Sequence, residues 1–398
     1  MLRYFLPFLD SEVKHWAFEA RLLRWLTFLW LCIGLVAMFS ASYPVADLMQ
    51  KDGLFYVKRQ IVWILVGLFC FNVVVRSPLK SLCKVSGWLL MFAWFLIILT
   101  IIPGIGTEVL GATRWIALGP VKVQPSEFAK PFLILQAAQV FGRWRKLRWD
   151  ARFGWLCVFA GILGCILIQP NLSTTALCAM TIWFIAVAAG LPWINLGSTA
   201  VVGLMTAIVS ISAHEYQRRR LMFFLDPFID ARGQGYQLVQ SLLAIGSGGG
   251  WGVGFGLSQQ KLFYLPIQHT DFIFAVFAEE FGFIGCFSFL LLLLFYASVG
   301  TYVALRSQNL IKRLVAMGAT FALIGQSLLN IGVTTGVLPT TGLPLPLFSY
   351  GGSSVISSLI CAALLVRVAR ESKEAQVVSM TNRRQRYKRG SRSFKPSL

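Results

Sequence analysis

Apolar runs of about 20 residues recur along this chain, and they restrict its fold more than any other feature. Inside a bilayer such a run must be a helix, because no water is present to satisfy open backbone groups. The clearest runs are residues 25–43, 61–75, 88–102, 153–168, 175–189 and 272–303. Only 13% of the 398 residues are charged, about half the share found in soluble domains. We therefore expect an integral membrane protein.

The predicted fold class is all-α, a polytopic membrane bundle of about ten transmembrane helices. The expected spans are 25–43, 59–75, 86–102, 124–142, 153–169, 173–189, 195–212, 272–303, 314–338 and 353–369. Residues 1–24 precede this membrane domain of residues 25–369, and a basic tail of residues 370–398 follows it. The longest connection is a large extracytoplasmic loop, residues 213–271, between the seventh and eighth spans.

The basic residues indicate how the bundle is oriented. Most of them lie in residues 1–24, 76–85, 143–152, 304–313 and beyond 366. Positively charged segments stay in the cytoplasm, so both termini are predicted to be cytoplasmic. The tail has two interpretations: a disordered segment on the anionic inner leaflet, or a docking peptide for a cytoplasmic partner.

The net charge of +20 does not indicate a nucleic-acid-binding protein. The positive residues are interrupted by membrane spans and do not form one basic domain. The eight cysteines lie in or beside apolar spans, and no pair has CxxC spacing. We interpret them as small apolar packing residues rather than a disulfide or metal framework.

The end of the long loop holds the first candidate for chemistry, Asp271, in the sequence QHTDFIF. A carboxylate at the start of a span can simply cap the helix, and so can Thr270. The same span also carries Glu279 and Glu280. Carboxylates at membrane depth are rare and usually functional, so both alternatives stay open. The glycine-rich residues 246–256 favour a flexible surface loop on composition alone, although glycines also permit close approach to the bundle.

Two further polar clusters interrupt the apolar pattern. One contains Arg114 and Trp115 in GATRWI, then Glu127 and Lys130 in QPSEFAK. Glu127 and Lys130 are spaced to pair on one helix, while Arg114 fits either a membrane anchor or a phosphate clamp. The other cluster, residues 330–354, is broken by prolines and glycines and includes Ser349. Such breaks are tolerated where backbone is buried in protein or lines a cavity.

These segments together resemble the SEDS (shape, elongation, division, sporulation) family of peptidoglycan glycosyltransferases over about residues 20–370. The likeness is carried by GATRWI, QPSEFAK, GQGYQLVQSLLAIGSGGG, LPIQHTDFIFAVFAEEFGFIG and NIGVTTGVLPTTGLPLPLFSYGGSS. The segments QSLLAIGSGGG and GLSQQKLFYLP look more like the division branch of the family than the elongation branch. The resemblance implies a bacterial plasma-membrane enzyme at the division septum that polymerises lipid II. It also implies a class B penicillin-binding protein, other divisome proteins and membrane lipid as partners.

The resemblance assigns roles to individual positions. It implies that Asp271 is the essential catalytic acid, and that Arg114, Trp115 and Lys130 bind substrate. This chain departs from many relatives at two places, with Ile267-Gln268 and Pro170-Asn171 where an acid often stands. Both changes leave Asp271 as a more isolated carboxylate. Further substrate-binding candidates are Arg218, Arg219, Glu279 and Ser349.

The implied reaction requires a general base and positively charged groups. A sugar hydroxyl is a poor nucleophile, so one positioned base is useful. The departing diphosphate needs its charge matched, for which the candidates are Arg114, Lys130, the arginine run 218–220 or a divalent metal such as Mg²⁺ or Mn²⁺. In the metal scheme, Asp271 is a metal ligand instead of the base. Two other functions remain open: a lipid II flippase, and a non-enzymatic division scaffold.

Overall fold

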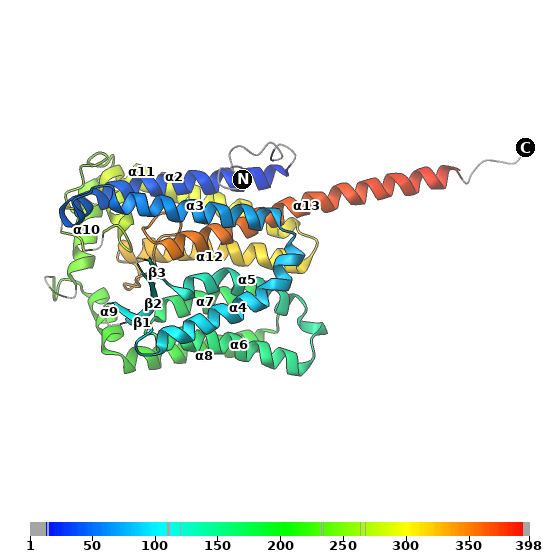
Figure 1. Ribbon diagram of the computed structural model, residues 1–398, viewed down its shortest axis with the longest axis horizontal. Coiled ribbons are helices and arrows are strands. Elements are labelled where there is room, and N and C mark those ends of the chain that lie inside the picture. The colour runs from blue at the N-terminus through cyan, green and yellow to red at the C-terminus, as the bar shows by residue number, and fades with distance from the viewer. Residues whose placement is uncertain are drawn as a thin grey trace, which may run out of the picture.

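The computed structural model describes residues 13, 16–109, 112–119, 121–231, 233, 235–262, 264–266 and 268–392. Ten long helices dominate this part of the chain (Figure 1). They are α2 (Phe18–Gln50), α3 (Phe55–Arg76), α4 (Leu79–Ile101), α5 (Pro125–Gly142), α6 (Trp149–Ile168), α7 (Leu172–Ala188), α8 (Trp193–Ala213), α11 (Ile273–Arg306), α12 (Leu310–Thr334) and α13 (Gly352–Arg392). Each coincides with one expected span, which confirms the predicted helical membrane bundle.

Length and hydropathy separate these helices. Eight are long and apolar enough to cross a membrane, and α7 is a shorter apolar helix. The remaining helix, α5, carries the charged residues Glu127 and Lys130 in its first turns. These charges lower the hydropathy of α5. The helix is buried among its neighbours, because it contacts α4, α12, α7 and α13.

The centre of the bundle is occupied by α13. In its apolar part, 89% of the residues are buried, compared with 11% for α8. It packs against α3, α12, α2, α5 and α11 (Figure 1). The outer surface of α8 is therefore available to lipid, while α13 lies among other helices.

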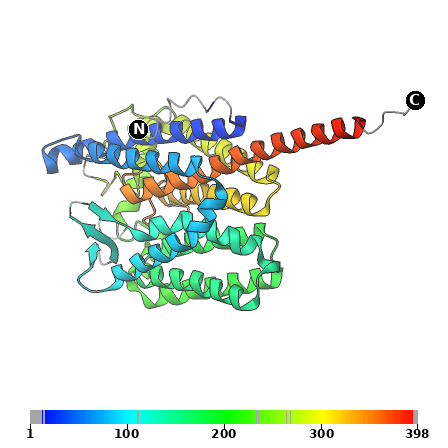
Figure 2. The same ribbon diagram turned by 45° about the vertical axis from the view of Figure 1, so that its right-hand side comes forward.

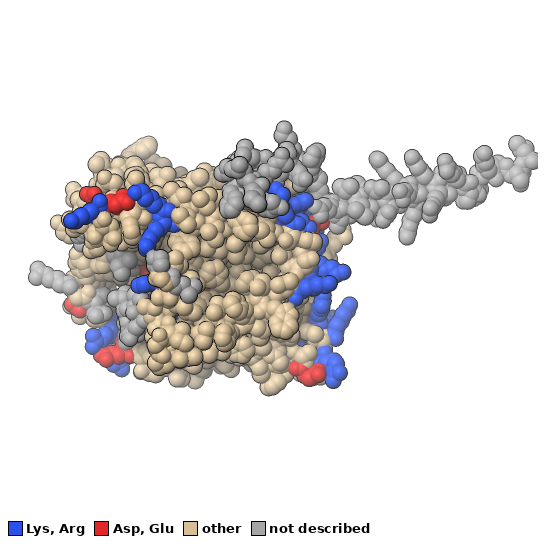
Figure 3. All heavy atoms as spheres, in the orientation of Figure 1, with Lys and Arg blue, Asp and Glu red and all other residues tan. Residues whose placement is uncertain are grey.

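The two ends of the bundle differ in structure. One end holds a small sheet and the short helices α9 (Glu215–Leu225) and α10 (Tyr236–Gly248), while α13 projects from the other end (Figures 1 and 2). Lysines and arginines gather at both ends, and a broad band without charge separates them (Figure 3). This band has the distribution expected of a surface that faces hydrocarbon chains.

The small sheet was not predicted from the sequence. Its strands β1 (Gly106–Val109), β2 (Ala112–Leu118) and β3 (Val121–Val123) pair antiparallel in the order β1-β2-β3. Arg114 and Trp115 lie on the central strand, where neighbouring side chains point to opposite faces. The sheet joins α4 to α5 and is a minor addition to an otherwise helical fold.

The interpretation of residues 246–256 as a flexible surface loop is wrong. Helix α11 breaks at Gly282 (φ 63°, ψ −164°), and the glycine-rich segment 248–254 docks into the break. Backbone N–H groups of Val253 and Gly254 donate to the carbonyls of Glu279 and Glu280, and that of Phe283 donates to Gly249 O. Close approach excludes side chains here, because a Cβ on Gly252 would lie 2.2 Å from Glu280 O.

The two terminal segments differ from expectation in their boundaries. The first membrane helix begins at Phe18, inside the predicted segment 1–24, most of which lies outside the described residues. The expected disorder of the tail is not observed up to Arg392, because α13 continues as helix to that residue. Residues 371–389 contain no proline or glycine and many good helix formers. Residues 393–398 lie outside the described part.

Candidate functional site

Asp271 lies at the entrance of α11, and it does not cap the helix. The N-cap residue is Phe272, and no side-chain cap hydrogen bond is present there. The capping alternatives for Asp271 and Thr270 are therefore wrong. The carboxyl group of Asp271 therefore makes no capping hydrogen bond to α11.

The backbone around Asp271 is held by side chains from other segments. Asn330 on α12 donates from Nδ2 to the carbonyls of Asp271 and Leu343, at 2.7 Å each. Ser349 donates to Thr270 O at 2.6 Å and accepts from Leu345 N at 2.8 Å. These bonds join the start of α11 to residues 339–351, which connect α12 to α13. The hydroxyl of Ser349 thus positions the backbone, and its predicted substrate contact stays a prediction.

Two arginines lie close enough to act on the Asp271 carboxyl group. Burial raises the pKa of Asp271, while Arg220 and Arg114 oppose that rise. A buried carboxyl with two guanidinium groups nearby resembles the environments in which enzymes tune acids and bases. The two arginines come from α9 and β2, elements far apart in sequence.

Only one of three consecutive arginines on α9 faces the bundle. Arg220 donates to Thr340 O at 3.2 Å and is partly buried. Arg219 pairs with Glu215 on the exposed surface, and Arg218 is also exposed. Successive helix residues point about 100° apart, so the three side chains diverge. The predicted substrate contacts of Arg218 and Arg219 stay predictions, while Arg220 lies beside Asp271.

Strand β2 directs Arg114 toward the α6–α7 connection. Its guanidinium group donates to Gln169 O at 3.4 Å and to Pro170 O at 2.5 Å. Trp115 is half-buried and points to the other face of the strand. Of these two residues only Arg114 is charged, and its guanidinium group acts to lower the pKa of Asp271. Substrate contact by either residue stays a prediction.

His269 packs in an aromatic cluster two residues before Asp271. Its ring lies 4.6 Å from that of Tyr56 on α3 and 5.6 Å from that of Tyr350. Its backbone carbonyl accepts from Tyr350 N at 2.9 Å. Burial lowers the pKa of His269 to about 4, so the imidazole is neutral at physiological pH.

Lys130 forms a buried ion pair with Glu127 on the same helix. Its ammonium group is 2.7 Å from Glu127 Oε2 and donates to Gln326 Oε1 at 2.8 Å. Gln326 in turn donates to Pro344 O at 2.7 Å. The expected Glu127–Lys130 pairing is confirmed. Lys130 is connected to the residue 339–351 segment through Gln326, and its predicted role in substrate binding is not tested.

Both glutamates of α11 hold the long loop against the bundle. Glu279 accepts from Ser258 Oγ and from the backbone N–H of Gln259 at 2.5 Å and 2.9 Å. Glu280 pairs with Lys261 at 2.7 Å, and both side chains are at least 95% buried. Glu279 therefore fixes a turn, and substrate binding by it stays a prediction.

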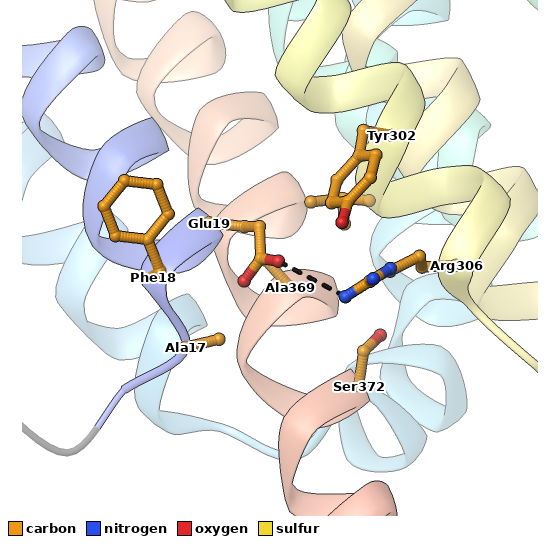
Figure 4. Close-up of a pocket in the computed structure, with 8 residues that line it drawn as sticks. Ala17, Phe18, Glu19, Tyr302, Arg306, Ala369 and Ser372 are labelled. Atoms are coloured by element: carbon orange, nitrogen blue, oxygen red, sulfur yellow. Dashed lines mark ion pairs between the residues drawn. The ribbon is translucent and has the colours of Figure 1, made fainter.

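A cavity of about 290 Å³ lies at the opposite end of α11. Its lining includes Glu19, Tyr302, Arg306 and Ser372, with Glu19 and Arg306 3.8 Å apart (Figure 4). More than 30 residues of helix separate it from Asp271. This cavity is therefore distinct from the site built around Asp271.

Comparison with known proteins decides the family. Residues 20–374 match the model of the FtsW/RodA/SpoVE family, described as cell cycle proteins. The chain belongs to this family. A probable peptidoglycan glycosyltransferase FtsW from Synechocystis is 57% identical over 96% of both chains. A putative peptidoglycan glycosyltransferase FtsW from Mesostigma viride is 49% identical over 93% of this chain and 88% of its own.

Solved structures of FtsW/RodA/SpoVE proteins share the fold. A structure described as coordinating polymerization and crosslinking in a peptidoglycan synthase complex matches with a TM-score of 0.70 and 31% identity. It covers 88% of this chain and 97% of that chain. The rod shape determining protein RodA of Thermus thermophilus matches with a TM-score of 0.65 and 28% identity, covering 88% of this chain and 96% of its own.

In this FtsW/RodA/SpoVE protein, the site offers one carboxylate for a metal ion. No group of three His, Cys, Asp or Glu side chains suited to a metal occurs in the described part of the chain. Mg²⁺ is commonly held by one or two carboxylates together with substrate phosphates. Asp271 alone therefore fits a cation shared with a phosphate-bearing substrate, and does not fit a resident metal centre.

The two departures from the usual family pattern have different outcomes. Asn171 accepts from Thr174 N at 3.3 Å and caps α7, so it replaces an acid with another good N-cap residue. Ile267 lies outside the described residues, and the neighbouring Gln268 donates to Lys261 O. The sequence offers Arg220 only as one of three consecutive arginines, and Asn330 only as part of the polar cluster 330–354, without a role beside Asp271. A helical projection of α9 separates Arg220 from its neighbours, whereas the bond from Asn330 to Asp271 O spans 59 residues and leaves no local signal.

Proposed function

We propose that this chain is a peptidoglycan glycosyltransferase that polymerises lipid II during septal cell-wall synthesis. Lipid II is a disaccharide-peptide carried on undecaprenyl diphosphate. The observation that carries the proposal is the half-buried Asp271 with Arg220 and Arg114 acting on its carboxyl group. The names of the most similar relatives support this enzyme class, and they favour the division branch over the RodA-like elongation branch.

Asp271 acts as the general base in this proposal. The acceptor hydroxyl oxygen bonds to the anomeric carbon of the donor, and its proton passes to the Asp271 carboxylate. The bond between that carbon and the diphosphate oxygen breaks, with the electron pair leaving on the diphosphate. The raised pKa of Asp271 brings the carboxylate closer to the working pH, where a base both remains ionised and holds a proton better.

Arg220 and Arg114 match the negative charge of the diphosphate. Guanidinium groups suit this work because they are always charged and bind phosphate oxygens in pairs. Both are anchored by backbone carbonyls, Arg220 by Thr340 and Arg114 by Gln169 and Pro170. Anchored charges need little reorganisation during the reaction. Asp271 would be the residue that holds a Mg²⁺ or Mn²⁺ ion, which would supply further positive charge.

The proposed setting is the plasma membrane at the septum, with both termini in the cytoplasm. The end with Asp271, α9 and the sheet then faces outward, where lipid II is polymerised. A class B penicillin-binding protein is the proposed partner, alongside other divisome proteins and membrane lipid. The similar peptidoglycan synthase complex, which couples polymerization to crosslinking, supports a partner of this kind.

The charged residues that suggested a flippase are paired with other groups in the structure. A polar path through the bundle was expected from Glu127, Lys130, Glu279 and Glu280. In the structure Glu127 pairs with Lys130, Glu280 pairs with Lys261, and Glu279 binds a loop turn. The scaffold alternative is tested by the same experiment as the enzyme, since a scaffold does not require Asp271.

The decisive experiment is polymerisation of labelled lipid II by the complex of the purified protein and its penicillin-binding protein in nanodiscs. We would compare wild type with Asp271→Asn, using a partner inactivated in its crosslinking site. Glycan ladders from wild type that disappear in Asp271→Asn, with the complex intact, are the expected result. Equal ladders from both would exclude Asp271 as the base. An intact complex that makes no ladders would contradict the enzyme and favour the scaffold or flippase.

A further inference from the structure

The shell around Asp271 contains buried polar atoms without a hydrogen-bond partner. Asn330 Oδ1 and Thr341 Oγ1 are both fully shielded and unpaired. Leaving such an atom unsatisfied destabilises the fold, and most buried polar atoms in proteins are paired. Two such atoms, on residues next to the Asp271 segment, therefore call for a partner outside the chain.

The orientation of Asn330 is fixed by its neighbours. Its Nδ2 atom faces two carbonyl oxygens, those of Asp271 and Leu343. The amide oxygen is thus an acceptor that lacks a donor. Gln326, one turn earlier on α12, shows the contrast, because its amide donates to Pro344 O and accepts from Lys130.

Thr341 directly precedes Gly342, which lies against the Asp271 carboxyl group. A Cβ on the next residue, Gly342, would be 3.4 Å from Asp271 Oδ2 and 3.9 Å from Arg220 Nη1. Gly336 and Gly342 both have positive φ, 72° and 71°. Glycines tolerate this region at little cost, which allows the chain to pass close to Asp271 here.

We propose that Asn330 Oδ1 and Thr341 Oγ1 bind the acetamido group of an N-acetylated sugar when substrate occupies the Asp271 site. An acetamido group presents one N–H and one carbonyl. The N–H donates to Asn330 Oδ1, and the hydroxyl of Thr341 donates to the carbonyl oxygen. This inference rests on the proposed function and adds to it the part of the substrate that is recognised.

The test uses Thr341→Val, which removes the hydroxyl and keeps the shape of the side chain. The apparent KM is measured for the lipid-linked acetamido disaccharide in the complex with the penicillin-binding protein. An analogue with hydroxyl groups in place of the acetamido groups is measured in parallel. Binding of both lipids is also measured on an Asp271→Asn background. The matched control is Thr181→Val on α7, where the lost hydroxyl is buried and bonded to Leu177 O at 2.7 Å.

We expect Thr341→Val to raise KM about three- to tenfold, the value of one hydrogen bond. The kcat should change less than twofold, and the preference for the acetamido lipid over its analogue should shrink. The melting temperature of the free protein should stay the same or rise, whereas Thr181→Val should lower it without changing KM.

An unchanged KM and an unchanged preference in Thr341→Val would overturn the inference while leaving the polymerase intact. A lowered melting temperature would also count against it, because the hydroxyl would then be paired in the free protein. Selective binding of the acetamido lipid without polymerisation would contradict the proposed function and support the subsite. A wild-type protein that binds both lipids equally overturns the subsite directly.

Discussion

At the scale of the residue, Asp271 illustrates how much a sequence can predict. Its position before an apolar span and its family motif point to this carboxyl group. The partners that give it chemical character come from α9, β2 and α12. Such contacts depend on tertiary packing, so the sequence cannot single out Arg220 from its run of three arginines or Asn330 from its polar cluster. Glu279, predicted from its membrane depth, holds a loop turn in the structure, and its substrate contact stays a prediction.

Replacing Asp271 should separate activity from stability. Asp271→Asn removes the base, so turnover should fall about 10²–10⁴-fold. The raised pKa means that the ionised form of Asp271 destabilises the fold. The contribution of Asp271 to folding stability is therefore complete below its ordinary pKa and is lost as the pH rises through the raised pKa. The neutral variant should therefore melt at the same or a higher temperature near pH 7. A clearly lower melting temperature would show that Asp271 is structural.

The pH dependence of turnover should follow the same group. The base works only when ionised, so kcat should fall as pH drops through the raised pKa of Asp271. His269 is already neutral above about pH 4, because burial lowers its pKa. His269→Gln should therefore keep the acidic limb of the profile in place. A limb that moves with this variant would assign the titration to His269.

At the scale of the element, the broken helix α11 is the feature that the sequence does not reveal. The expected span 272–303 is longer than a bilayer requires, which is consistent with two helical pieces. Gly282 permits the break, and the segment 248–254 fills it through backbone hydrogen bonds. Glycine content alone predicts freedom of the chain, and here it gives close packing. The short piece that begins with Ile273 carries Asp271 at its entrance.

Adding a methyl group at the break should weaken this attachment. Gly252→Ala places a Cβ 2.2 Å from Glu280 O at φ 84°, and strained backbone of this kind costs about 1–3 kcal/mol. We expect a lower melting temperature and lower turnover. Gly246→Ala on α10 is the control, because no atom lies within 4 Å of its added Cβ. Equal effects of both variants would contradict a role for the docked segment.

The buried pair of Lys261 and Glu280 should behave as a unit. Removing one partner leaves an uncompensated charge, so Lys261→Met should destabilise the protein by about 3–5 kcal/mol. Combining it with Glu280→Gln should recover part of that loss. Lys58→Met breaks the exposed Lys58–Asp52 pair and should leave the melting temperature unchanged. Additive losses in the double variant would show that the pair is not coupled.

At the scale of the whole molecule, the fold was predictable because membrane physics leaves few choices. Each expected span is a helix, although the ends differ by several residues at α2 and α12. The sheet β1–β3 was not predicted because its strands are short and lie between two spans. Its turn-rich sequence carries no alternation strong enough to overcome the surrounding pattern.

The part of α13 that projects from the bundle should be dispensable for folding. The contacts that fix this helix come from its buried part and from Glu371, which pairs with Lys312 and Arg367. Removing residues 377–398 should leave the melting temperature and polymerisation in nanodiscs unchanged. The measurement is thermal unfolding of full-length and shortened protein. A large drop in melting temperature would show that the projecting helix supports the bundle.

The burial of α13 also sets an order on biosynthesis. This helix is the last of the ten to leave the ribosome, yet it occupies the centre of the bundle. Nine helices must therefore enter the bilayer before the element that holds α2, α3 and α5 together exists. During translation the polar side chains that will face α13 lack their partner and are exposed to lipid or to the insertion machinery. Assembly of the site around Asp271, whose residues 339–351 lead directly into α13, is accordingly one of the final events in making the protein.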